Sequence, residues 1–346
     1  MTQFYKKKKF YIPTIIIAVL IIFRMVLPQI LLHQANKYLS EFSPTYYLHM
    51  DDLDLSILRG AYSFQGVTGN LKGDEKQFLK ITEVDVSIAW RHLLKGKVVT
   101  DIVTQDLDFL FLSDMTKLNP PKKEAEDVKE TLFPVKVESV DLKNARVVFE
   151  EYPALADNSR LKIENINGRI TNLTPSEADP LSDFNLGASI QGSSELVFIG
   201  SLNLIKKPML WDVDVEMKNF NLASLNAVLK RNLPLTFTKG NLDLYAEAKN
   251  EKGVIKGYIK PFITNIDVVA NKEKFVGIKH FGIEVLTALA NLILRDSETK
   301  TVATYVDFNY DGKFNINTSQ GIEKAIENGF NQKLTPGIEN KYHMDK

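Results

Sequence analysis

Beyond about residue 40, the chain alternates apolar and polar residues in one short run after another. A period of two is typical of β-strands that have one dry face and one wet face. Roughly fourteen such runs occur, joined by turns rich in Gly, Asn, Asp and Pro. The pattern predicts a mainly β protein built on a long antiparallel sheet. The apolar positions of the clearest runs are Val84, Val86, Ile88, Trp90, Trp211, Val213, Val215, Met217, Leu242 and Leu244.

Helical periodicity is limited to a few places in the C-terminal part. Residues 281–295 place apolar side chains on one stripe, and residues 322–334 repeat an apolar residue every fourth position until Pro336 stops the pattern. A short helix is also expected at 223–230. These amphipathic helices are too few to cover a sheet of this size. The dry face must therefore close on itself as a sandwich or barrel, or curl around a foreign apolar ligand.

Four segments share an irregularity in their alternation. The segments starting at Leu48, Leu79, Val135 and Leu161 all follow the pattern apolar-x-apolar-x-x-apolar. The double gap moves the period by one residue, which predicts a β-bulge or a tight corner that keeps the dry face inward. The order of the segments also suggests a weak internal repeat. Either a duplication or convergent β-patterning explains it.

The N-terminus has a different pattern, in which apolar residues run without alternation. Residues 12–34 are almost wholly apolar, and roughly 20 such residues span a bilayer core of about 30 Å. No small-residue cleavage site closes the run, which favours an uncleaved anchor over a signal peptide. Arg24 lies past the middle, where its long stem can reach the interface. The basic residues that precede the segment, and that predict a cytoplasmic N-terminus, are Lys6, Lys7, Lys8 and Lys9.

The expected organisation follows from these patterns. Residues 1–11 form a basic cytoplasmic tail, residues 12–34 a single transmembrane anchor, and residues 42–338 one domain outside the cytoplasm. A polar segment at 118–132 contains Pro120 and Pro121 followed by charged residues. It is a possible sub-boundary, but we interpret it as an excursion from a continuous sheet.

Composition removes several classes of function. Lys and Arg together number 43, as do Asp and Glu, so the net charge is zero. Without a basic field or a recognisable motif, no nucleic-acid partner is expected. The chain has no cysteine, which excludes disulfides, thiolate nucleophiles and zinc sites built on cysteine.

A search for catalytic chemistry yields only one weak candidate. The five histidines have no metal-ligand spacing, and none of the usual hydrolase, nucleotide or zinc motifs is present. Asp212, Asp214 and Glu216 share one strand face and could bind calcium or act as acid and base. We interpret them instead as the wet face of a strand, which must be polar whatever the function. The sequence therefore predicts no enzyme, no catalytic residue, no metal and no cofactor.

The dry face is the more informative chemistry. In a chain tethered to a bilayer, the obvious apolar ligand is the acyl tail of a lipid. Burial of each CH₂ group is worth about 0.8 kcal/mol, so an apolar groove can hold acyl chains without a specific pocket. The ten apolar residues named above are the candidates for lining such a groove.

Several segments carry a resemblance to a known family. They are LDLSILRGAY at 53–62, VSIAW at 86–90, LLKG at 93–96, FPV at 133–135, VVF at 147–149, FNLASLN at 220–226, GNLDLYAE at 240–247, GYIKPF at 257–262 and the stretch 330–336. Together with the anchor, they resemble the AsmA-like family of bacterial inner-membrane proteins, especially its short members that carry a domain of unknown function. The most specific piece is GYIKPF.

The resemblance implies a periplasmic, curved β-groove related to bridge-like lipid transfer proteins, with phospholipids as partners and no catalytic residues. Members of the family are associated with outer-membrane integrity. Fourteen strands at about 4.8 Å stack to roughly 65 Å, which is short for a continuous bridge across an envelope. We therefore expect an inner-membrane protein that binds or transfers acyl chains. The alternatives are a structural module that binds another envelope protein and, with least support, a hydrolase.

Overall fold

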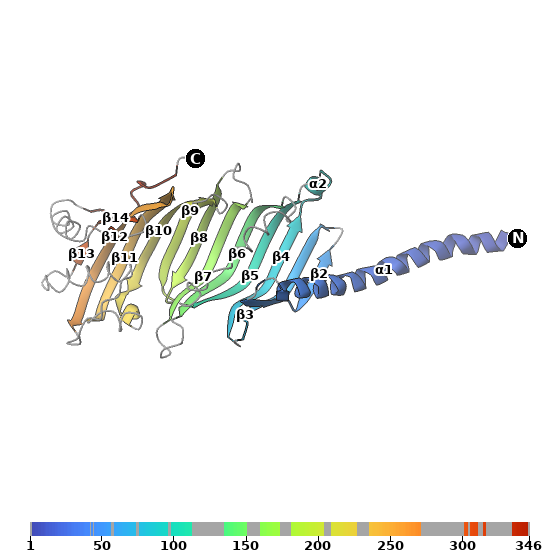
Figure 1. The fold of residues 1–346 in the computed structure, drawn as a ribbon, viewed down its shortest axis with the longest axis horizontal. Coiled ribbons are helices and arrows are strands. Elements are labelled where there is room, and N and C mark those ends of the chain that lie inside the picture. Colours follow the sequence, from blue (N-terminus) through green and yellow to red (C-terminus); the bar gives the residue numbers. More distant parts are fainter. Residues whose placement is uncertain are drawn as a thin grey trace.

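A long, open β-sheet with a helix projecting from one end makes up the described part of the molecule (Figure 1). The computed structural model describes residues 2–41, 43, 45–56, 59–73, 76–95, 98–112, 135–150, 160–173, 181–203, 209–226, 235–270, 301–303, 305–310, 314–315 and 334–344. The predicted helices at 281–295 and 322–334 lie outside these residues, apart from Leu334. The polar segment at 118–132 also lies outside them.

The N-terminal helix α1 (Thr2–Glu41) contains the whole predicted anchor. Its stretch within Pro13–Glu41 is long and apolar enough to cross a membrane. Asn36 ties the helix to the sheet, because its side-chain amide donates to the Met50 carbonyl and accepts from the Met50 N–H, both at 2.8 Å. Figure 1 shows α1 leaving the sheet close to the long axis of the molecule, at the end opposite the C-terminal strands.

The strands follow each other in nearly sequential order across the sheet. They are β1 (Tyr46–His49), β2 (Asp52–Ser56), β3 (Ala61–Leu71), β4 (Gln77–Ile88), β5 (Val98–Leu112), β6 (Val135–Glu150), β7 (Leu161–Leu173), β8 (Ser182–Ile190), β9 (Ser194–Asn203), β10 (Leu210–Asn221), β11 (Leu235–Glu251), β12 (Val254–Ala270), β13 (Thr301–Ala303), β14 (Val306–Tyr310) and β15 (Phe314–Asn315). The path runs β1-β3-β4 and onward to β12-β14-β15, with β2 beside β3 and β13 beside β12. The end strands β1 and β15 do not pair with each other, so the described strands do not form a closed barrel.

One neighbouring pair departs from the expected antiparallel arrangement. Strands β5 and β6 are parallel, whereas the other pairs in the described sheet are antiparallel. A parallel neighbour requires a connection that returns the chain to the starting end, usually of a dozen residues or more. Residues 113–134 provide that length. The mainly antiparallel sheet is confirmed, and the polar excursion falls at its single parallel junction.

The double gaps in the sequence correspond to bulges and corners in the sheet. The Leu48 segment divides into β1 and β2 at a corner, and the register shifts between Thr100 and Asp101 opposite β6 and between Glu164 and Asn167 in β7. Residues with left-handed backbone stand at the period changes, namely Gly66 (φ +61°), Asp106 (φ +51°), Asn144 (φ +54°) and Asn165 (φ +54°). Gly, Asn and Asp adopt this conformation at the lowest cost. The predicted irregularity is confirmed in three of the four segments, whereas β4 keeps a constant register with β3 and β5 from Ile81 to Val84.

The internal repeat is not matched by equivalent topology. In the first set of segments β3 lies between β2 and β4, whereas in the second set β6 and β7 are direct neighbours. The shared pattern therefore reflects a shared bulge, as convergent patterning explains, and not two copies of one folding unit.

Among the described residues, a compact core lies toward one end of the later strands. Its buried members include Met217, Phe220, Phe237 and Leu242, and a 3₁₀ turn, η3 (Leu222–Leu225), covers them. Asn226, the last described residue before β11, is helical, so the predicted helix at 223–230 starts within this turn, and residues 227–230 lie outside the described residues. Asn221 caps it by accepting from the Ala223 N–H at 3.0 Å.

Candidate lipid-binding face and the polar face behind it

Two rows of apolar side chains cross the sheet on one face, from the strands beside α1 to β14. The strand register places directly paired residues of twelve strands in each row. The first row is Leu53, Phe64, Val84, Thr104, Leu142, Gly168, Leu186, Phe198, Val215, Ala246, Ile259 and Val306. The second row is Leu55, Tyr62, Val86, Ile102, Val140, Ile170, Phe184, Gly200, Val213, Ala248, Gly257 and Phe308. We call these the apolar rows.

The apolar rows are continuous over a distance that matters for a membrane ligand. Twelve strands at a spacing of about 4.8 Å extend about 50 Å. Thr104 is the one row member with an aliphatic hydroxyl, and its Oγ1 is buried without a hydrogen-bond partner among the described residues. Phe184 and Phe308 lie over Gly200 and Gly257, where a Cβ would stand 2.7 and 2.6 Å from their Cζ atoms. Aromatic rings thus fill two of the three positions where the rows lack a side chain, and Leu186 lies beside the third, Gly168.

Most members of the apolar rows are only half-buried. Leu53 and Leu55, beside α1, are buried, but Val84, Val86 and Val215 retain intermediate exposure. The inward residues of a sealed β-sandwich are expected to be largely buried by the facing sheet. The described residues contain no second sheet that packs on this face.

Nine of the ten predicted groove residues divide into three groups. Val84, Val86, Val213 and Val215 belong to the apolar rows, and Ile88 and Trp211 lie on the same face with intermediate exposure. Met217 and Leu242 are 6% and 7% exposed in the compact core, against which Leu244 also packs.

Trp90 is a correction to the strand prediction. Strand β4 ends at Ile88, whose N–H donates to the Gly60 carbonyl at 2.7 Å, and β3 begins only at Ala61. With no β3 residue left to pair with, the chain turns into helix α2 (Trp90–Leu93). Trp90 is 42% exposed there and does not continue the apolar strand face.

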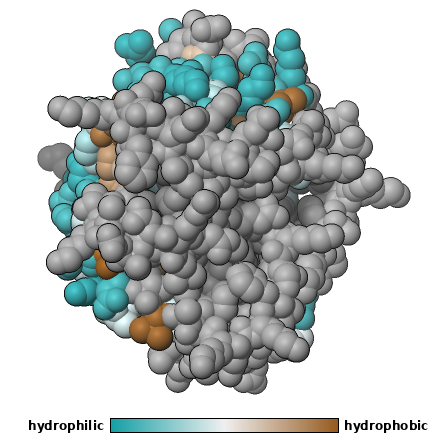
Figure 2. All heavy atoms as spheres, turned by 90° about the vertical axis from the view of Figure 1, so that its left-hand side faces the viewer, coloured by the Kyte–Doolittle hydropathy of each residue, from teal (hydrophilic) through white to brown (hydrophobic). Residues whose placement is uncertain are grey.

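The opposite face of the sheet carries charged and polar side chains, some of them paired across strands. Arg169 on β7 holds Asp141 on β6 through two hydrogen bonds of 2.5 and 2.7 Å. These bonds lower the pKa of Asp141 below its ordinary value. Figure 2 shows the end of the sheet that carries the C-terminal strands. The coloured residues at the rim of this view are mostly hydrophilic, with scattered hydrophobic ones.

The C-terminal segment 334–344, which we call the strap, crosses this polar face over β10, β11, β12 and β14. Glu247 is fully buried beneath it and accepts from the N–H groups of Lys341 at 2.6 Å, Tyr342 at 2.9 Å and Asn340. Lys260 is 1% exposed and donates to the Thr335 carbonyl at 2.9 Å and to Glu339. This contact could not be predicted from the sequence, because the strap has no periodicity and its partners alternate like the residues of any wet face.

The acidic residues on β10 are therefore not all a plain wet face. Asp212 is buried, and it accepts from the Ser201 N–H at 2.7 Å and the Met344 N–H at 2.9 Å. Burial raises the pKa of Asp214 to about 6, and the negative charges of Glu247 and Asp212 add to the effect. Glu216 forms an ion pair with Lys218 at 2.8 Å. The interpretation of all three as wet-face residues is wrong for Asp212.

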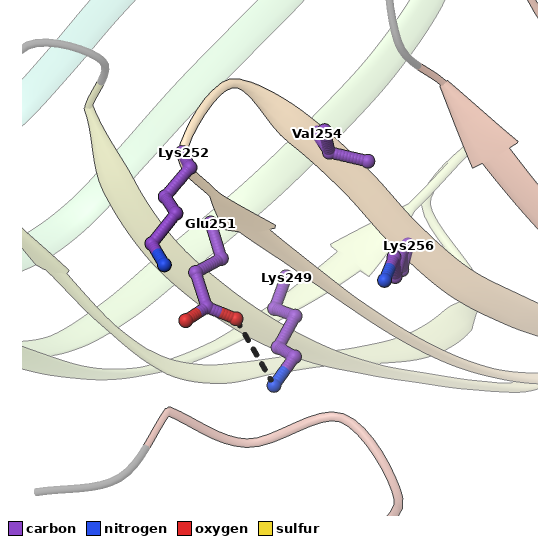
Figure 3. A pocket seen from close by; sticks show the side chains of 5 residues that line it. All are labelled: Lys249, Glu251, Lys252, Val254 and Lys256. Atoms are coloured by element: carbon purple, nitrogen blue, oxygen red, sulfur yellow. Dashed lines mark ion pairs between the residues drawn. The ribbon is translucent and has the colours of Figure 1, made fainter.

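Two pockets flank the strap on the polar face. The first, of about 270 Å³, lies at the β11–β12 hairpin and is lined by Lys249, Glu251, Lys252, Val254 and Lys256 (Figure 3). Lys249 pairs with Glu251 at 3.8 Å and donates to the His343 carbonyl at 3.2 Å. Lys252 and Lys256 are exposed, so we interpret this pocket as a hollow between the charged side chains of a turn and not as a binding site. The second, of about 670 Å³, is bordered by β7–β10 and the end of the strap.

Comparison with known proteins adds no identification. No family model matches the chain, and no curated protein is significantly similar to it. The class that the structure defines is a protein with one N-terminal helix able to span a membrane, followed by a long, mainly antiparallel sheet with one apolar face.

Proposed function

We propose that this protein is anchored in the inner membrane of a bacterium by α1 and binds phospholipid acyl chains along the apolar rows in the periplasm. The observation that carries the proposal is the continuity of the two rows across twelve paired strands, from the α1 end of the sheet to β14. The resemblance to the AsmA-like family supports the same reading. The basic residues Lys6–Lys9 favour a cytoplasmic N-terminus.

The dimensions of the rows suit a path better than a single pocket. The hydrocarbon of one leaflet is about half of a 30 Å core, whereas the rows extend about 50 Å. Acyl chains can therefore lie end to end, or one chain can occupy successive positions. Since each buried CH₂ contributes about 0.8 kcal/mol wherever it lies on an apolar surface, affinity need not be concentrated at one strand. This supports transfer or storage of lipid without catalysis.

Native mass spectrometry of the full chain in detergent tests the proposal. The wild-type protein should retain phospholipid. Val215→Asp places a carboxylate in the first apolar row and should lower the number of phospholipids retained per chain, because an acyl chain over β10 would have to desolvate that charge. Val148→Asp is the matched control on the polar face, where the register sets Lys162 beside it.

The two variants separate the outcomes. Circular dichroism should show that both remain folded, since Val215 and Val148 are half-buried. Loss of lipid in Val215→Asp alone supports the proposal. Equal retention in all three proteins, or no lipid on the wild type, contradicts it, and an envelope protein retained in place of lipid would favour the structural module.

A further inference from the structure

Three side chains that commonly bind metals meet where the strap crosses the sheet. They are Asp214 from β10, Glu247 from β11 and His343 from the strap, and one ligand atom from each lies within 4.8 Å of the others. Asp214 and Glu247 are directly paired in the strand register, so they project from the same face. The group joins segments that are far apart in the chain, and spacing along the sequence could not reveal it.

The local environment leaves one acceptor unsatisfied. Oδ1 of Asp214 is buried and has no hydrogen-bond partner among the described residues. Glu247 has no exposed surface, and its oxygens already orient toward the strap through three backbone N–H groups. Asp212, which is buried, brings a third carboxylate close by. A buried carboxylate oxygen without a partner is costly, and a cation removes that cost.

We propose that Asp214, Glu247 and His343 bind a divalent cation of the zinc type, which fastens the strap to the sheet. Imidazole with carboxylate oxygens suits zinc and its neighbours better than calcium or magnesium, which prefer oxygen alone. Zinc–ligand distances near 2.1 Å place the ligand atoms of a tetrahedral site about 3.4 Å apart. The exposed side chain of His343 can rotate to close the remaining distance.

The surroundings fit a structural ion with one open position. Asp214 and His343 border the 670 Å³ pocket, which leaves room for a water as a fourth ligand. The strap amides that bond Glu247 hold a ligating carboxylate in place, as outer-shell groups do in metal sites. Metal binding and strap docking should therefore support each other, because the ion binds a set of ligands that exists only when the strap is docked.

The test uses the full chain in detergent with zinc ion alone as the probe. Titration calorimetry should detect one zinc per chain, and His343→Ala and Asp214→Asn should each weaken it at least tenfold, a loss typical of a disturbed metal site. His49→Ala is the matched control, since His49 lies in β1 at the other end of the sheet. Its affinity should equal that of the wild type.

Hydrogen exchange provides the second readout. Zinc should slow exchange of the amides of Asn340, Lys341 and Tyr342 several-fold in the wild type and in His49→Ala, but not in His343→Ala, while exchange in β4 stays constant in every variant. The proposal is overturned if the wild type binds no zinc, if His343→Ala binds it as tightly as the wild type, or if zinc binds without protecting these amides.

Discussion

At the scale of single residues, the sheet depends on positions where the backbone of neighbouring strands leaves no room for a side chain. A Cβ at Gly200 would lie 2.2 Å from the Asp212 carbonyl oxygen and 2.7 Å from Cζ of Phe184. At Gly187, on the neighbouring strand, the nearest atom would be 4.0 Å away. The two glycines therefore have different reasons to be present.

Gly200→Ala should lower the free energy of unfolding by about 1–3 kcal/mol, because the strands must move apart to admit the methyl group. Gly187→Ala should change it by less than about 1 kcal/mol in either direction. Urea unfolding of both variants, compared with the wild type, measures the difference. Equal stability of the two variants would show that the aromatic ring and strand backbone near Gly200 are not tightly packed.

The residue scale is also where the sequence was least informative. Alternation identified Val84, Val86, Val213 and Val215 as dry-face residues, because burial of a face repeats every second position. It could not separate Asp212 and Glu247, buried under the strap, from the other polar residues on the same face. Burial by a distant segment leaves no local pattern, and for the same reason the Asp214, Glu247 and His343 group was missed.

At the scale of elements, the bulges keep one face apolar along strands that would otherwise change sides. Asn144 has φ of +54°, and its side chain donates to Oδ1 of Asp106 at 2.5 Å on the neighbouring strand. After Asn144, the apolar positions of β6 move from Val140 and Leu142 to Ala145 and Val147. The double gap of this segment predicted only the earlier irregularity between Val137 and Val140, and not the bulge at Asn144. The parallel β5–β6 junction was not predictable either, since strand direction depends on the long connection between the two strands.

Asn144→Val should lower the free energy of unfolding by about 1–3 kcal/mol, because a β-branched residue is strained at positive φ. Asn144→Gly should retain most of the stability, since glycine adopts the conformation freely. Urea unfolding with circular dichroism compares the two. If Asn144→Val is as stable as Asn144→Gly, residue 144 does not need a left-handed backbone at this bulge.

Removal of the strap should affect only the strands beneath it. A chain ending at residue 333 leaves Glu247 and Lys260 without the strap partners described above, and the Tyr258 hydroxyl without the Glu339 N–H that donates to it at 2.8 Å. Hydrogen exchange in β11 and β12 should therefore accelerate, while β3–β5 keep wild-type protection. Removal of residues 345–346 alone is the control and should change neither region. Unchanged exchange in β12 of the shorter chain would mean that the strap contributes nothing to local stability.

At the scale of the whole molecule, α1 and the sheet form one elongated body in which strand order runs away from the helix (Figure 1). If α1 crosses a membrane, successive strands lie at increasing distance from it. The mainly β class, the apolar helix and the one-sided face were all predictable, because each produces a periodic signal in the sequence. The open edges and the strap were not, because they depend on contacts between distant segments.

The absence of cysteine makes the proposed topology simple to measure. Glu195→Cys, on the exposed surface of β9, should react with a membrane-impermeant thiol reagent in cells whose outer membrane has been permeabilised. Thr2→Cys should react only after the inner membrane is also disrupted, because the basic flank holds the N-terminus in the cytoplasm. Labelling of Thr2→Cys before Glu195→Cys would show that the protein has the opposite orientation in the membrane.

The central claim, that the apolar rows carry acyl chains along the sheet, is tested most directly by site-specific photocrosslinking in cells. A photoreactive residue is placed singly at Val84, Val215 and Val306 of the first row, and at Val103, Val148 and Ile199 on the polar face. We predict phospholipid adducts at all three row positions, near α1 and far from it, and none at the three controls. Adducts distributed equally over both faces, or no lipid adduct at any row position, would contradict the account.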